Sequence, residues 1–121
     1  MNPEENTNHS QVLLEDNLKK ALTELLMLSL LSKKEYYVGE LSAALREKSG
    51  GVLTIVFPYS ALYRLQKLSC IKELGNRNAP DGRRRQYYGI TETGRVYLAQ
   101  QLSTYQRFLG GVKAVLEEGE S

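Results

Sequence analysis

The sequence contains few of the residues on which most metalloproteins and disulfide-bonded proteins depend. Among its 121 residues there is one cysteine, Cys70, one histidine, His9, and no tryptophan. A single cysteine excludes a disulfide within the chain and a cysteine-rich zinc site. Because Cys70 stands in the apolar stretch LSCIKEL, we expect a buried small side chain rather than a reactive thiol.

Patterns that would indicate catalysis are missing as well. The sequence shows no carboxylate pair, nucleophile–base set, phosphate-binding glycine loop or metal-ligand spacing, and His9 lies in a polar N-terminal segment. We therefore expect no enzymatic activity, no metal and no cofactor.

Long hydrophobic runs are also lacking. The longest largely apolar stretch covers residues 25–31, whereas a membrane-spanning helix needs about 20 residues. The N-terminus does not have the basic and then apolar composition of a signal peptide. We expect a single domain in the cytoplasm with no membrane partner.

The positive charge is concentrated in one part of the chain. The overall net charge is +2, but residues 58–88 hold seven basic side chains against Glu73 and Asp81, a net charge of +5, and the remainder carries −3. A local block of positive charge on an otherwise acidic chain indicates a localised anionic partner.

Apolar periodicity predicts three helices in the first part of the chain. Residues 1–10 are polar and aperiodic, which predicts a disordered tail. A helix is expected from residue 12 to about residue 31, and a shorter one follows in VGELSAALREK. The third, PYSALYRLQKLS, begins at Pro58, a residue that suits the first turn.

The third predicted helix has two different faces. Its apolar face holds Ala61, Leu62, Leu65 and Leu68. The opposite face holds Tyr59, Ser60, Tyr63 and Lys67, with Arg64 on the flank. A short helix with donors and acceptors on its outer face is suited to the major groove of DNA.

A β-hairpin with a long tip is predicted next. The turn formers NAPDG separate CIKELGNR from RRRQYYGIT. Strand alternation places Arg83, Arg85 and Tyr87 on one face, which favours Arg83 and Arg85 over Arg84 as the exposed arginines. We expect Tyr88 to pack with its neighbours in the core and Tyr87 to support the hairpin.

A last helix is expected from Thr91, a suitable N-cap, to about residue 118. Its apolar residues are spaced as in the seam of a coiled coil, which favours a dimer interface over folding back onto the domain. The predicted interface consists of Leu98, Leu102, Tyr105, Leu109, Val112 and Leu116. Gly110 and Gly111 interrupt the seam, and the sequence leaves open whether they break the helix.

The order of three helices, a hairpin and a final helix predicts a winged helix-turn-helix, a mainly α fold with a small β-hairpin. We expect a DNA-binding domain over residues 11–90 and a C-terminal dimerisation helix over residues 91–118. Arginine guanidinium groups match phosphate geometry, so the hairpin is expected on the DNA backbone. The predicted DNA-binding residues are Tyr59, Ser60, Tyr63, Arg64, Lys67, Arg83, Arg84 and Arg85.

Two stretches, LTIVFPYSALYRLQKLSCI and GRRRQYYGITETGRVYL, resemble the PadR-like transcriptional regulators of prokaryotes. The resemblance extends from about residue 18 to residue 102. It implies a homodimeric repressor of the short-tailed branch, in which the last helix packs against the first helix of a partner. It also implies relief by a small aromatic inducer between subunits, for which Tyr105 and Phe108 are the candidate ligand residues.

The sequence departs from the family pattern at EYYVGEL and VFPYS, so the operator and the inducer are not predicted. A different function stays open beside DNA binding. The same fold could serve as a protein–protein interaction module, in which case the basic block would have no role in binding DNA.

Overall fold

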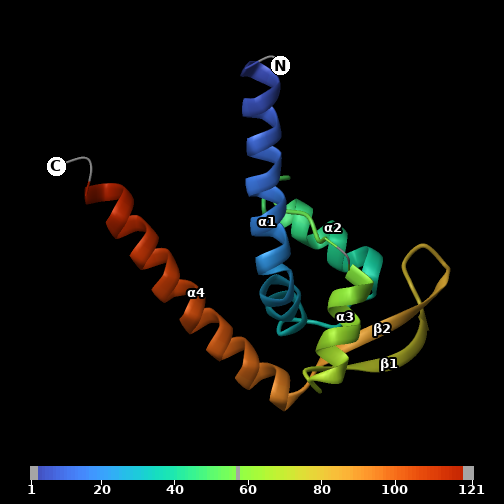
Figure 1. Cartoon of the computed structure of the whole chain (residues 1–121). Helices are drawn as coiled ribbons and strands as arrows, with labels where there is room; N and C mark the ends of the chain where they lie inside the picture. The colour runs from blue at the N-terminus through green and yellow to red at the C-terminus, as the bar shows by residue number, and fades with distance from the viewer. Residues whose placement is uncertain (1–2, 57, 119–121) are drawn as a thin grey trace.

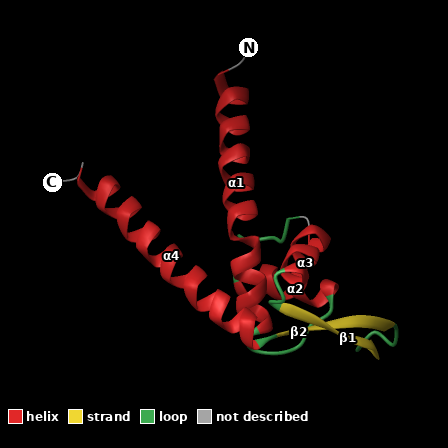
Figure 2. Ribbon diagram, turned by 60° about the horizontal axis from the view of Figure 1, so that its bottom comes forward, coloured by secondary structure: helices red, strands yellow, loops and turns green. Residues whose placement is uncertain are grey.

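The computed structural model describes residues 3–56 and 58–118. Four helices and a two-stranded antiparallel hairpin make up the winged helix-turn-helix that the sequence predicts (Figure 1). The elements are α1 (Pro3–Leu31), α2 (Val38–Lys48), α3 (Pro58–Lys67), β1 (Ile71–Asn78), β2 (Arg84–Ile90) and α4 (Glu92–Glu118). The helices α1 and α4 diverge from a common base, and the hairpin extends from that base on the side away from α4 (Figures 1 and 2).

Helix α1 is longer than the sequence predicts. It begins at Pro3, so the expected disordered tail over residues 1–10 is wrong for residues 3–10. Proline is favoured in the first turn of a helix, where no hydrogen bond from its nitrogen is needed. Extending a helix that is already formed adds one hydrogen bond per ordered residue, which makes such an extension easy.

The core lies at the base of the molecule. The buried apolar side chains of the described chain all fall between Leu25 and Leu98. Met27 and Leu28 of α1, together with Leu41 of α2, have no solvent exposure. Helix α3 buries Ala61, Leu62 and Leu65 against them, as its apolar face predicts.

Leu68 does not belong to this apolar face, which is a correction to the prediction. Helix α3 ends at Lys67, and Leu68 is 39% exposed. The chain turns immediately afterwards, because Ser69 adopts the left-handed conformation with φ of 60°. Cys70 then enters the core with 1% exposure, as predicted, and burial raises the pKa of its thiol.

The hairpin is tied to the base of α4. Thr91 caps α4: its Oγ1 accepts a hydrogen bond from Gly94 N at 3.0 Å and donates one to Ser69 O at 2.5 Å. Thr91 N also donates to Cys70 O at 3.0 Å. Gly94 is buried so close to that same carbonyl that a Cβ atom would overlap it.

Helix α4 runs without interruption through Gly110 and Gly111 to Glu118. The predicted seam along it is divided between two environments. Leu98 is 8% exposed and belongs to the core of its own domain, so its assignment to a dimer interface is wrong. The remaining members of the seam are exposed: Leu102, Tyr105, Leu109, Val112 and Leu116. The difference arises because α4 contacts α1 near the base and then diverges from it (Figure 2).

Candidate nucleic-acid interface

The outer face of α3 is open to solvent. Tyr59 is 71% and Tyr63 63% exposed, and Ser60 and Lys67 are exposed beside them. The Lys67 ammonium lies 5.3 Å from the centre of the Tyr63 ring. Four of the side chains predicted to bind DNA therefore form one accessible polar surface on this helix.

Arg64 has a different environment on the flank of α3. Its Nε lies 2.6 Å from Glu24 Oε1 on α1. The negative charge of Glu24 raises the pKa of Arg64, and a hydrogen bond with Tyr97 of α4 contributes in the same direction. The guanidinium thus connects α3 with both long helices, and its predicted contact with DNA stays a prediction.

The three arginines of the hairpin differ in exposure. Arg83 precedes β2 and is exposed, and Arg84 is exposed and donates from Nη2 to Asn76 O at 3.0 Å. The Arg85 side chain is only 37% exposed, with Nη2 3.1 Å from Asp81 Oδ2 and its guanidinium carbon 5.6 Å from the centre of the Tyr37 ring.

These contacts correct the expectation that Arg83 and Arg85 are the exposed pair. Alternation does place Arg85 and Tyr87 together, but their face covers the segment that leads into α2. The Tyr87 ring meets the Tyr37 ring edge to face, with centroids 5.5 Å apart. Tyr88, on the other face, is buried at 9% exposure, in agreement with its predicted place in the core.

A cleft of about 570 Å³ joins the two predicted DNA-binding segments. Tyr59 of α3 and Arg84 of β2 both line it, with Tyr37 and Gly39 at the start of α2. Residues 25 positions apart in the sequence therefore share one concave surface. The helix face and the hairpin can contact the same extended ligand.

Tyr37 and Gln86 are residues of this cleft that sequence reasoning missed. The stretch SKKEYY was read only as the end of the first helix. The adjacent tyrosines were the available signal: Tyr36 is buried and pairs with β2 through Tyr88, which leaves Tyr37 facing the hairpin.

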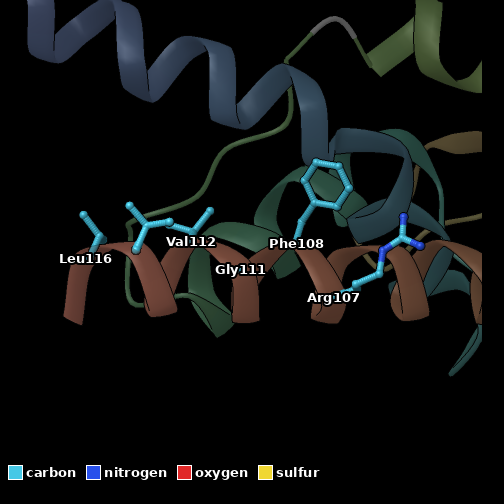
Figure 3. A pocket seen from close by; sticks show the side chains of 6 residues that line it. Arg107, Phe108, Gly111, Val112 and Leu116 are labelled. Carbon is cyan, nitrogen blue, oxygen red and sulfur yellow. The ribbon is translucent and has the colours of Figure 1, made fainter. Parts of the chain in front are cut away.

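The residues predicted to bind a ligand lie on α4. Phe108 is 64% and Tyr105 39% exposed. An open apolar depression of about 510 Å³ runs beside Phe108, Val112 and Leu116, whose side chains extend from the same side of α4 (Figure 3). All of its lining residues belong to α4. In the described part of one chain, no second element covers this surface.

Two further searches concern other kinds of site. Within residues 3–56 and 58–118, no group of three or more His, Cys, Asp or Glu side chains is placed to hold a metal ion. No helix in the same ranges is both long enough and apolar enough to cross a membrane.

A polar recognition helix beside a basic hairpin defines the class of winged-helix DNA-binding proteins. Residues 27–100 match the model of the transcriptional regulator PadR-like family. The chain belongs to this family, and it is a DNA-binding transcriptional regulator rather than an enzyme.

Solved structures of similar proteins agree with this assignment. A transcriptional regulator from Clostridium thermocellum is 27% identical, with a TM-score of 0.72 over 81% of this chain and 93% of the other. A PadR-like transcriptional regulator from Bacillus cereus is 26% identical, with a TM-score of 0.70 over 84% and 97% of the two chains.

A PadR family regulator from Eggerthella lenta shares the fold at 22% identity, with a TM-score of 0.73 over 94% of this chain and 96% of the other. No curated protein shows significant sequence similarity to the chain.

Proposed function

We propose that the protein is a homodimeric, sequence-specific repressor of transcription. The observation that carries the proposal is the shared cleft, in which Tyr59 of the recognition helix α3 and Arg84 of the hairpin line one surface. Two copies of α3 would enter successive major grooves about 34 Å apart, with both hairpins on the flanking backbone.

The residues of this interface have different roles in the proposal. The exposed arginines contact phosphates, which supplies affinity without sequence information. Ser60 and Tyr63 lie on the outer face of α3 and read or position the bases. Lys67 stands one turn further along the same face, suited to a phosphate at the edge of the groove.

The proposed dimer forms through the two long helices. Leu13, Leu14 and Leu18 of α1 are each about half exposed or more, at 48%, 61% and 51%. The exposed seam of α4 from Leu102 to Leu116 is equally uncovered. Isolated exposed leucines are common, but two such rows on diverging helices form a large apolar area that a second copy would cover.

Relief of repression by a small aromatic molecule is the finer part of the proposal. Tyr105 and Phe108 would contact such an inducer between the two subunits. The inducer can act only by binding one arrangement of the recognition helices more tightly than the other.

Selection of bound fragments from genomic DNA by the purified protein tests the DNA-binding proposal. Replacing Arg83, Arg84 and Arg85 together by alanine should weaken binding and flatten its dependence on salt. Lys113→Ala is the matched control, because it removes an exposed positive charge from α4. Failure of the wild type to bind any fragment at low salt would instead favour a protein–protein interaction module.

Substitution of Ser60 or Tyr63 separates base reading from positioning. A change in the selected sequences would assign these side chains to base recognition. An equal loss for all sequences would restrict them to backbone contacts. Sedimentation of the same protein tests the dimer, which a monomer at micromolar concentration would contradict.

A further inference from the structure

We propose that a chain of ion pairs and stacked rings fixes the hairpin against the start of α2, and that Arg85 is a positioning residue in this chain rather than a phosphate ligand. We call it the wing brace. Its members are Glu35, Arg77, Tyr87, Tyr37, Arg85 and Asp81. The inference rests on the proposed function, because it assigns different roles to the arginines of the DNA-binding hairpin.

The first half of the brace joins the α1–α2 connection to the middle of the hairpin. Arg77 of β1 forms an ion pair with Glu35, with Nη1 3.0 Å from Oε1. The Arg77 guanidinium carbon lies 5.4 Å from the centre of the Tyr87 ring. Tyr87 meets the Tyr37 ring at an interplanar angle of 69°. Edge-to-face ring pairs and guanidinium–ring contacts are both attractive beyond the area that they bury.

The second half extends from Tyr37 to the tip of the hairpin. Arg85 lies over the Tyr37 ring and is paired with Asp81, which also accepts a hydrogen bond from Arg83 N at 3.0 Å. The Nε of Arg85 is buried and has no hydrogen-bond partner. The guanidinium is therefore held between a ring and a carboxylate of its own chain.

The backbone around Tyr37 is shaped to hold its ring. A Cβ atom at Gly39 would lie only 2.9 Å from Tyr37 Cε2, so the glycine leaves the space that the ring occupies. The preceding residue is fixed as well: Tyr36 exchanges main-chain hydrogen bonds with Tyr88 at 3.3 and 2.9 Å. Tyr37 is thus anchored on the domain side before it contacts the hairpin.

The hairpin needs such support because little else holds it. Along β1 only Ile71 is buried, and Leu74 is half-buried. An isolated two-stranded hairpin is marginally stable in water. Ordering it beforehand reduces the entropy cost of binding DNA.

The brace leaves two arginines available. Arg83 and Arg84 are exposed, and neither forms an ion pair within the described part of the chain. We therefore assign phosphate contact to Arg83 and Arg84, and control of the hairpin's position to Arg85 and Tyr37.

Amide hydrogen exchange of the DNA-free protein tests the brace directly. Arg85→Gln and Tyr37→Leu should each accelerate exchange of the protected amides within residues 79–86 about fivefold, which corresponds to ~1 kcal/mol. Arg83→Gln removes the same charge at the tip without breaking a side-chain contact of the brace, and it should leave the rates unchanged. Equal rates in Arg85→Gln and Arg83→Gln would overturn the brace.

A double-mutant cycle guards against a general loss of stability. In the Tyr37→Leu background, Arg85→Gln should add no further acceleration, because the contact is already lost. Additive effects of the two substitutions would mean that the residues act separately, which contradicts the proposal. Unfolding in urea identifies any variant that loses stability throughout.

Binding to a labelled mixed-sequence DNA duplex tests the assignment of roles. Arg83→Gln should reduce the slope of log affinity against log salt by ~0.9, the value for one phosphate contact. Arg85→Gln should keep the wild-type slope while weakening affinity about fivefold. A slope reduced as much as in Arg83→Gln would show that Arg85 contacts a phosphate and overturn its assignment. If the wild type fails to bind duplex, the proposed function fails, while the exchange experiment still decides on the brace.

Discussion

The base of the molecule and its two projecting helices use similar apolar side chains in different surroundings. At the base, leucines from α1, α2 and α3 are nearly inaccessible to solvent, as in Leu28, Leu41 and Leu65. In the projecting parts of α1 and α4, leucines such as Leu14 and Leu116 are exposed by 61% and 69%. The base is complete within one chain, whereas the helices are not.

Helix α4 belongs to both regions, so it shows where one changes into the other. Its first two turns contain Gly94 and Leu98, both buried, and from Leu102 onward its apolar residues are exposed. A continuous helix thus carries the structural requirements of two interfaces. The buried one is observed within the chain, and the exposed one is the surface that we assign to a second copy.

The largest effect is expected at the junction between the regions. Gly94→Ala would place a Cβ against the Cys70 carbonyl and 2.8 Å from Ile90 Cγ1, neither of which can move freely. We expect the free energy of unfolding to fall by about 3 kcal/mol, the upper end of the range for overpacked cores. Urea unfolding at constant protein concentration measures it.

The matched control lies on the same helix. No atom lies within 4 Å of the Cβ position at Gly110. Alanine is favoured over glycine in a helix interior by about 1 kcal/mol, so Gly110→Ala should not destabilise the domain. Equal losses in the two variants would mean that Gly94 has no special role at the junction.

The next effect separates the two regions by concentration. Leu98→Ala should lower the free energy of unfolding by about 2 kcal/mol, the lower end of the range for buried leucines, since Leu98 is at the edge of the core. This loss should be the same at every protein concentration. Leu109→Ala, two helical turns beyond Leu102 and 42% exposed, should destabilise only the dimer, so its effect should vanish on dilution.

Unfolding curves measured over a wide range of protein concentration distinguish these behaviours. A loss in Leu109→Ala that does not change on dilution would place Leu109 in the fold of its own domain. It would also remove the main support for a dimer formed through α4.

Periodicity was sufficient to predict the base of the molecule. The leucines of α3, the turn at NAPDG and the cap at Thr91 each depend on neighbours close in sequence, and the structure confirms them. Leu98 was misassigned because the seam in α4 has one spacing throughout, although its environment changes when the helix leaves α1. A pattern within one helix does not contain that information.

The arginines of the hairpin show the same limit. Strand alternation correctly placed Arg85 and Tyr87 on one face, but which face meets solvent depends on Tyr37, about 50 residues earlier in the chain. The length of α1 escaped prediction for a different reason: residues 3–10 lack the apolar periodicity on which the prediction relied, and helices can extend without it.

The smallest effect concerns the tip of the hairpin, which projects like the helices but is held by charge rather than by apolar cover. Hydrogen bonds from Arg83 N and the Arg85 side chain lower the pKa of Asp81 below its ordinary value of 3.8. A carboxyl group with a lowered folded pKa stabilises the fold fully above its unfolded pKa, and this contribution is lost as pH falls through the folded value. The difference in unfolding free energy between wild type and Asp81→Asn should therefore stay constant at neutral pH and shrink below pH 3.8. The amide resonance of Arg83 should shift over the same acidic range in the wild type alone, and a shift that persists in Asp81→Asn would assign the titration to another carboxylate.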